Sequence, residues 1–295
     1  MQPVRFLKGH GTENDFVLLP DPDAALTVTP ALVRRLTDRR AGIGGDGVIR
    51  VVPTAAVEDV AWQAGEAPWF MDYRNADGGL AEMCGNGARV FARYLVDAGL
   101  AQLGQFSIAT RGGVRAIEVT GHDVTVDMGP CTPMDPAEVA VEVGGRRYLG
   151  QALSMGNPHV AVPVSDLADA GDLVHAPVVD PSAPFPTGVN VEFVLGRGPG
   201  RIAMRVFERG VGETRSCGTG ACAAAVAAAG WWGAETLDYQ VEVPGGVLRV
   251  RSTPAGSILL SGPTAFVASG VVDPGLWAGQ PAGSAAELAA AGVPG

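Results

Sequence analysis

The segment MCGNGAR at residues 83–89 has a near repeat, SCGTGACA, at residues 216–223. Each follows a run with strand-like alternation of apolar residues, Trp69–Arg74 in the first case and Ile202–Glu208 in the second, and then a glycine-containing turn. Each is followed by a helical pattern. The two cysteines, Cys84 and Cys217, are separated by close to half of the 295-residue chain. Strand, turn, C-G-x-G-A and helix thus occur once per half, which predicts two domains of similar architecture.

The rest of the sequence predicts many short strands and few helices, because 42 glycines and 22 prolines are scattered throughout. Strands are expected at Val4–Lys8, Phe16–Leu19, Gly47–Val52, Trp69–Arg74, Gln105–Ala109, Val114–Val119, Val124–Met128, Arg147–Met155, His159–Val164, Val189–Leu195, Ile202–Glu208, Tyr239–Val243, Val247–Thr253 and Ser257–Ser261. Helices are expected at Pro30–Arg40, Gly87–Ala98 and Thr219–Trp232, with a short one at Ser165–Ala170.

A turn at Gly129-Pro130 divides the chain into an N-terminal half, residues 1–129, and a C-terminal half, residues 130–262. A last strand at about residues 263–276 is expected to return to the first half. Residues 277–295 are rich in alanine, glycine, proline and serine, and we expect a flexible tail there.

Composition excludes several classes of function. With 47% hydrophobic and 18% charged residues the chain reads as a soluble globular protein. A net charge of −10 argues against partners such as nucleic acid or anionic membranes. No apolar run is long enough for a membrane span, and the N-terminus lacks the pattern of a secretory signal. Four cysteines in no dense pattern suit a reducing compartment. The cytoplasm is the expected location.

Lys8 is the only lysine in the chain. Pyridoxal enzymes hold their cofactor as a lysine Schiff base, so that chemistry would depend on one residue of a first strand. The phosphate-binding loop G-x-x-x-x-G-K-[ST] is absent, and no G-x-G-x-x-G opens a helix after a strand. Cysteine and histidine spacings typical of structural zinc are absent as well. We therefore expect no cofactor and no metal.

A cysteine directly before a helix lies at the positive end of the helix, where the thiol pKa is lowered and the thiolate favoured. The first helical amides lack intrahelical partners, and the glycines let an anion approach them. Two such loops, at Cys84 and Cys217, suggest two acid/base groups that flank one carbon. Inverting a stereocentre requires removal of a proton on one face and delivery on the other, which a thiolate and a thiol can perform in either direction.

Seven motifs in order give the chain a specific resemblance to diaminopimelate epimerase, within the wider group of two-cysteine, proline-racemase-like enzymes. The motifs are GTENDF (11–16), GIGGDG (42–47), YRNADG (73–78), MCGNGAR (83–89), SMGNPH (154–159), GVNVEF (188–193) and ERGVGETRSCGTGACA (208–223). The resemblance implies cofactor-independent conversion of LL-2,6-diaminopimelate to the meso form, for lysine and peptidoglycan synthesis. It also implies an α+β fold of two pseudo-symmetric domains, each a curved, mostly antiparallel sheet around a central helix, and a homodimer.

Matching positions carry over the roles of the family's site residues. Cys84 and Cys217 match the acid/base pair. Glu208 and Arg209 match the pair that reads the distal end of the substrate, where arginine can hold a carboxylate with two hydrogen bonds. His159 and Glu208 match positions that adjust the thiol pKa values. The remaining substrate-binding positions are Asn14, Asn75, Gly85, Asn86, Asn157, Asn190, Gly218 and Thr219.

The chain departs from the family pattern at four places. Glu13 stands where many members have glycine, and Gly47 stands where some have a polar side chain. Residues Pro53–Pro68 match no motif and are expected to be a surface insertion. Arg215 adds a cation near Cys217 that either lowers the thiol pKa or faces solvent.

Residues outside these motifs are interpreted as structural. Cys131 and Cys222 are expected to be structural thiols, Cys222 because it lies one turn into an alanine-rich helix. His10, His122 and His175 are expected at the surface or in structural roles.

Two other functions remain open at this stage. One is a proline or hydroxyproline racemase or epimerase of the same group, although a cyclic imino acid has no distal zwitterion for Glu208 and Arg209 to read. The other is a non-catalytic, thiol-containing binding protein with the same fold.

Overall fold

The computed structural model describes residues 3–233 and 236–278. The chain folds into two compact units. The first consists of residues up to Val124 together with residues from Thr264 onward, and the second is Thr125–Pro263. The chain thus leaves the first unit inside strand β7 (Asp123–Pro130) and returns between β17 (Ser257–Pro263) and β18 (Ala265–Val272).

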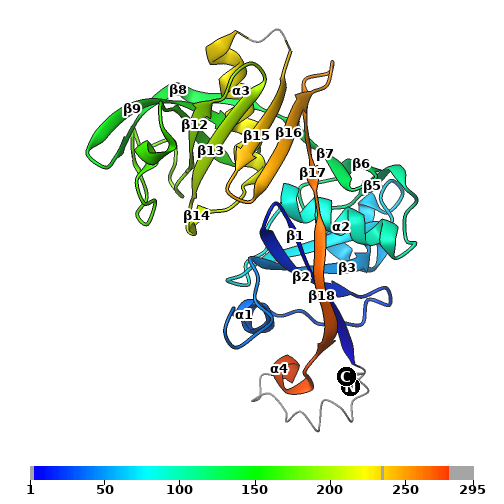
Figure 1. Cartoon of the computed structure of the whole chain (residues 1–295). Helices are drawn as coiled ribbons and strands as arrows, with labels where there is room; N and C mark the ends of the chain where they lie inside the picture. The colour runs from blue at the N-terminus through cyan, green and yellow to red at the C-terminus, as the bar shows by residue number, and fades with distance from the viewer. Residues whose placement is uncertain (1–2, 234–235, 279–295) are drawn as a thin grey trace. The chain divides into compact units, whose positions relative to one another are not determined.

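The first unit contains a five-stranded sheet in the order β18-β1-β2-β3-β4. Only β2 and β3 run parallel; the other neighbours in this sheet are antiparallel. Figure 1 shows the orange β18 beside the blue β1, although the two are at opposite ends of the sequence. The bounds of the other four strands of this sheet are β1 (Val4–Gly11), β2 (Asn14–Pro20), β3 (Gly47–Pro53) and β4 (Trp69–Asn75). The first unit also contains the antiparallel pair β5 (Gly104–Ile108) and β6 (Arg115–Thr120).

In the second unit the strands follow the order β11-β8-β9-β10-β12-β13-β15-β16-β17, and β14 also pairs with β13. The pairs β10–β12 and β13–β15 are parallel, and the other pairings within this order are antiparallel. The bounds are β8 (Thr132–Val143), β9 (Arg146–Ser154), β10 (Pro158–Pro163), β11 (Val178–Asp180), β12 (Asn190–Gly196), β13 (Arg201–Glu208), β14 (Gly212–Thr214), β15 (Asp238–Val243) and β16 (Gly246–Ser252).

One central helix packs against the strands of each unit, as expected for this α+β fold. Helix α2 (Gly85–Asp97) contacts β1, β2, β3, β4 and β6. Helix α3 (Gly218–Trp232) contacts β9, β10, β12, β13, β15, β16 and β17. Seven of the residues 221–228 of α3 are alanines or a cysteine with almost no exposed surface. A helix that is apolar on all sides is a buried helix, and small side chains let the strands approach it closely.

Helix α1 (Pro30–Thr37) is shorter than the predicted Pro30–Arg40. It begins at the N-cap Thr29, whose hydroxyl accepts from the N–H of Leu32. It stops at Thr37 because the following glycine loop folds back and donates its amides to the last helical carbonyls. A Cβ on Gly42 would lie 2.0 Å from the carbonyl oxygen of Arg35, so this approach requires glycine. The same loop places Asp46 beside β2.

Two segments differ from the sequence-based expectation. Strand β8 is not among the expected strands, because Pro133 and Pro136 interrupt the pattern; the structure accommodates them at a register shift between Pro133 and Glu138. The segment Pro53–Pro68, expected at the surface, forms the short 3₁₀ turns η1 (Thr54–Ala56) and η2 (Glu58–Gln63) and buries Val60 and Ala67 against Phe70. It is therefore part of the core of the first unit.

The remaining differences are small. The short helix expected at Ser165–Ala170 is the 3₁₀ turn η3 (Leu167–Ala170). Pro274–Ala278 forms helix α4, which contacts α1. Of the flexible tail expected at residues 277–295, Trp277 and Ala278 instead belong to helix α4, and residues 279–295 lie outside the described residues.

Asp72 of β4 is the centre of a buried cluster of charges. It is 3% exposed and lies 2.5 Å from Arg111, 3.3 Å from Arg74 and 3.8 Å from Arg50.

Asp72→Asn leaves these cations without their shared counter-charge, so we expect a loss of about 3 kcal/mol in the free energy of unfolding. Urea denaturation measures it. Asp97→Asn removes only an exposed pair with Arg93 and should cost less than about 0.5 kcal/mol; equal losses would contradict the prediction.

Candidate active site

Both repeated cysteines are the N-cap residues of the central helices. Cys84 Sγ accepts the N–H of Gly87 at 3.4 Å at the start of α2. Cys217 Sγ accepts the N–H of Gly220 at 3.3 Å at the start of α3. Each sulfur therefore satisfies one of the helical amides that have no intrahelical acceptor. Gly87 and Gly220 are the second glycines of the two C-G-x-G loops.

Around Cys84 the structure assembles two of the predicted asparagines. The Cys84 thiol lies 3.8 Å from Asn14 Oδ1, and Asn86 Nδ2 donates to the same oxygen at 3.2 Å. Asn86 is buried, whereas Asn14 and Cys84 are half-buried. The carbonyl oxygen of Asn14 is thus directed at the sulfur, as an acceptor for the thiol proton.

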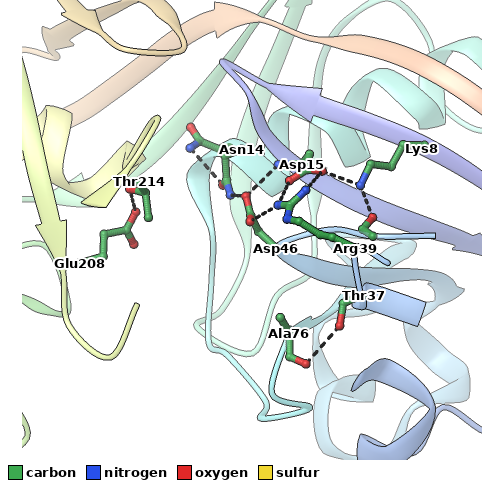
Figure 2. Close-up of polar contacts among 11 residues, drawn as sticks. Lys8, Asn14, Asp15, Thr37, Arg39, Asp46, Ala76, Glu208 and Thr214 are labelled. Carbon is green, nitrogen blue, oxygen red and sulfur yellow. Dashed lines mark hydrogen bonds and ion pairs between the residues drawn. The ribbon is translucent and has the colours of Figure 1, made fainter. Parts of the chain in front are cut away.

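A series of alternating charges holds Asn14 in this orientation (Figure 2). Asn14 Nδ2 donates to Asp46 Oδ2 at 2.7 Å, and Arg39 links Asp46 to Asp15 with contacts of 2.7 Å to each carboxylate. Lys8 pairs with Asp15 and donates to the carbonyl of Gly44. Because a carboxylate can only accept, Asp46 fixes which end of the Asn14 amide faces Cys84.

The two carboxylates of this series are affected in opposite directions. Burial acts to raise the pKa of Asp15, but hydrogen bonds from Arg39 and Lys8 outweigh it and hold that pKa well below its usual range. Burial and the neighbouring charge of Asp15 raise the pKa of Asp46. The only lysine of the chain therefore serves this ionic network.

Around Cys217 a different series of polar contacts forms. The sulfur lies 3.6 Å from Thr219 Oγ1, which accepts from Asn157 Nδ2 at 3.4 Å. Asn157 Oδ1 lies 3.1 Å from Nε2 of His159, and His159 Nδ1 lies 2.7 Å from Glu192 Oε1. His159 and Glu192 are fully buried. Four predicted site residues are thus brought together with Glu192, which lies within the motif GVNVEF but was not predicted as a site residue.

The pKa of Cys217 is raised well above 9.0, mainly because the thiol is buried and also because of the negative charges of Glu208 and Glu192. Hydrogen bonds from Thr219 and from the Gly220 amide act in the opposite direction. The expectation that the helix end would favour the thiolate was therefore wrong for Cys217. The donors are present, but desolvation and two carboxylates outweigh them. The negative charge of Glu208 therefore raises the pKa of the Cys217 thiol.

This raised pKa makes stability depend on pH. The folded protein holds the Cys217 proton more tightly than the unfolded chain, whose thiol titrates near 9.0. The contribution to stability is therefore present below that pH and is lost as the pH rises toward the folded-state pKa. We expect the free energy of unfolding to fall less steeply at alkaline pH in Cys217→Ala than in the parent protein. Urea unfolding across the alkaline range tests this, and parallel curves would contradict it.

Glu208, Arg209 and Asn190 lie close together at neighbouring strand ends. Thr214 Oγ1 donates to Glu208 Oε1 at 2.5 Å (Figure 2). The backbone N–H of Arg209 donates to Asn190 Oδ1 at 3.0 Å, and its guanidinium donates to Thr187 Oγ1 at 2.8 Å. Arg209 is exposed and lines a cavity of about 290 Å³. The other lining residues are Ala176, Pro177, Val179, Ser182, Phe185, Thr187, Gly188, Val189, Phe207 and Gly210.

The positions that depart from the family pattern have local explanations. Glu13 adopts a left-handed φ of 62° in the turn before Asn14 and is exposed. At Gly47 a Cβ would lie 2.5 Å from the carbonyl oxygen of Arg74 and 2.6 Å from the ring of Tyr73, so that ring fills the space. Arg215 is exposed and donates to the carbonyl of Pro244.

The other predicted residues are placed as follows. Asn75 ends β4, is exposed, and faces Gly47 in the strand register. Gly85 and Gly218 are the first residues of α2 and α3. Cys222 is fully buried in α3, and burial and the charge of Glu192 raise the pKa of the half-buried Cys131 to about 11. Within residues 3–233 and 236–278 no group of three acidic, cysteine or histidine side chains could hold a metal ion. In that same part of the chain no helix is long and apolar enough to cross a membrane.

Comparison with known proteins identifies the family. The family model described as diaminopimelate epimerase matches residues 6–133 and 151–267. The chain belongs to the diaminopimelate epimerase family. Its relatives include a diaminopimelate epimerase from Streptomyces coelicolor, 52% identical over 277 residues, with 92% of this chain and 96% of the relative covered. One from Mycobacterium ulcerans is 48% identical over 293 residues, covering 93% of this chain and 99% of the relative.

Solved structures of more distant proteins share the fold. A probable proline racemase from Agrobacterium radiobacter superimposes with a TM-score of 0.65 at 15% identity, covering 97% of each chain. A hydroxyproline epimerase from Agrobacterium vitis gives 0.59 at 16% identity, covering 92% of this chain and 94% of the other. At these identities the likeness shows the two-domain α+β architecture, which confirms the predicted fold class, and not the substrate.

Proposed function

We propose that the chain inverts one stereocentre of LL-2,6-diaminopimelate to give the meso form, with Cys84 and Cys217 as the two acid/base groups. The observation that carries this proposal is the repeated N-cap: each half of a diaminopimelate epimerase family member places one thiol at the start of its central helix. Relatives that are 48–52% identical over nearly the whole chain are named diaminopimelate epimerase. The reaction belongs to lysine and peptidoglycan precursor synthesis.

The chemistry needs one thiolate and one thiol. The thiolate takes the α-proton, the carbon becomes planar as charge passes into the carboxylate, and the thiol on the opposite face gives its proton to the carbon. In each direction of the reaction one of the two cysteines is the thiolate base and the other is the thiol donor. The roles exchange in the reverse direction. Helical amides at Gly85 and Asn86, and at Gly218 and Thr219, stabilise the carboxylate as its charge grows.

The other residues bind the substrate. Arg209 and Glu208 hold the distal carboxylate and ammonium, which are absent from a cyclic imino acid. Asn14, Asn75, Asn157 and Asn190 supply neutral donors and acceptors. The proline racemase alternative rests on fold similarity alone, at 15–16% identity. The binding-protein alternative would leave both capped thiols without a chemical role.

The proposal extends to the setting of the reaction. Because Lys8 is engaged by Asp15 and the carbonyl of Gly44, it is not placed as a Schiff-base lysine, which supports a mechanism without pyridoxal phosphate. We also propose a cytoplasmic homodimer, in keeping with the chain's composition and its family resemblance.

Steady-state assays with LL-diaminopimelate and with L-proline test the substrate assignment. We expect formation of meso-diaminopimelate without added cofactor and no racemisation of proline. Turnover of proline alone would overturn the assignment, and absence of α-hydrogen exchange with either compound in deuterated water would overturn the enzymatic function.

A further inference from the structure

The fully buried pair of Glu192 and His159 is the feature of the second unit that the mechanism above does not use. The two residues lie on the neighbouring parallel strands β12 and β10, and neither has exposed surface. Glutamate is almost never buried completely without a partner, because an isolated carboxylate loses its hydration. Glu192 Oε1 lies 2.7 Å from His159 Nδ1, and Oε2 has no hydrogen-bond partner among the described residues. The imidazole therefore compensates the buried carboxylate.

Both ring nitrogens of His159 face acceptors. Nδ1 faces the Glu192 carboxylate, and Nε2 faces the Asn157 carbonyl oxygen at 3.1 Å, while the amide nitrogen of Asn157 is directed to Thr219. A neutral imidazole has one donor and one acceptor nitrogen, whereas the imidazolium donates at both. The arrangement is therefore that of an imidazolium paired with a carboxylate.

This pair sets the direction of the hydrogen bonds that lead to Cys217. His159 Nε2–H donates to Asn157 Oδ1, and Asn157 Nδ2 then donates to Thr219 Oγ1. With that oxygen accepting, the Thr219 hydroxyl hydrogen is available to the sulfur of Cys217, 3.6 Å away. A neutral ring with its proton on Nδ1 would favour the reversed Asn157 amide, and Thr219 would then donate to Asn157 instead.

The packing around the second glycine of the C-G-x-G loop shows how closely the carboxylate approaches the thiol. A Cβ on Gly220 would lie 2.6 Å from Glu192 Oε1 and 3.2 Å from Cys217 Sγ, so glycine leaves room for both. The two atoms are at most about 6 Å apart, within the range at which charges influence one another. At the equivalent Gly87 the nearest atom is the methyl Cδ1 of Ile49, at 3.2 Å. The two thiol loops are thus alike in backbone but differ in what covers them.

We propose that Glu192 is a positioning residue of the Cys217 half of the site, which holds His159 as an imidazolium and thereby directs Asn157 and Thr219 toward the Cys217 sulfur. The inference rests on the proposed role of Cys217 as a proton donor and acceptor. It adds a group that lets this thiol gain and lose its proton while the net charge of the buried pair stays close to zero.

The direct test is nitrogen NMR of protein labelled with ¹⁵N-histidine, at neutral pH and without substrate. The chain has only four histidines, so the His159 resonances can be assigned by their loss in His159→Gln. We expect the signature of two protonated ring nitrogens for His159 in the parent protein. An unprotonated Nδ1 or Nε2 would overturn the proposal. The measurement involves no turnover, so its failure is distinguishable from failure of the proposed reaction.

Glu192→Gln keeps the shape of the side chain and removes its charge. We expect loss of the imidazolium signature and a decrease of about 10–100-fold in kcat with little change in KM, since the residue orients groups and does not touch substrate. Glu242→Gln, which removes an exposed carboxylate paired with Arg201, is the matched control and should change neither. An unchanged imidazolium in folded Glu192→Gln would contradict the proposal. If this variant does not fold, the result for the parent protein still decides.

Discussion

Replacing either Cys84 or Cys217 by serine is expected to lower kcat for epimerisation by about 10³-fold or more, because each half-reaction needs a sulfur acid or base that serine cannot replace. Serine holds its proton far too tightly to act as the base, and its smaller oxygen lies further from the carbon. The same two variants should lose exchange of the substrate α-hydrogen with deuterated water. Coupled assay of meso-diaminopimelate and mass spectrometry of exchange measure the two effects.

Cys222→Ala is the matched control, since this thiol is buried within α3. It should retain activity near the parent level. A serine variant of Cys84 or Cys217 that keeps more than about one tenth of the parent kcat would remove that thiol from the acid/base pair.

Arg209→Lys is expected to lower kcat/KM for diaminopimelate by about 100-fold, equivalent to about 3 kcal/mol of binding to the distal end. Lysine keeps the positive charge but loses the planar pair of donors that fits a carboxylate. The Arg209 guanidinium is exposed and tethered to Thr187 by one hydrogen bond, so donors remain for the substrate.

Arg197→Lys provides the control, because Arg197 is a surface residue near Glu242 and has no role in the site. Its kinetic constants should match those of the parent protein. If Arg209→Lys changed kcat/KM no more than Arg197→Lys does, the distal carboxylate would have to be recognised by other residues.

The elements that carry the two cysteines could be predicted from the sequence. In each half, a run with alternating apolar residues precedes a glycine-containing turn, and a helical pattern follows it. These local signals locate the starts of α2 and α3 to within two residues. The family motifs then indicated Asn14, Asn157 and Glu208. Strand β8 could not be predicted in the same way, because its pairing with β9 overrides the local effect of Pro133 and Pro136.

The surroundings of the two thiols needed the structure. Asp46 stands in a glycine-rich motif and orients Asn14 only because the loop folds back on α1. Glu192 stands in the apolar run VNVEFVL, where a single acidic residue is a signal of a buried pair. Its partner His159 is distant in sequence and becomes a neighbour only through the parallel register of β10 and β12. The raised pKa of Cys217 depends on such contacts. They cannot be inferred from the position of the cysteine at a helix end.

The pairing of β18 with β1 has a consequence for how the protein is made. Strand β18, which completes the first sheet, is synthesised after the whole second unit, whereas its partner β1 is synthesised before that unit. Until then β1 has an open edge on that side, with backbone groups ready to pair with another chain. The second unit, in contrast, is continuous from Thr125 to Pro263, so all of its strands have been synthesised before β18. The half that contains Cys84 is therefore the one whose nascent form has most need of protection from aggregation.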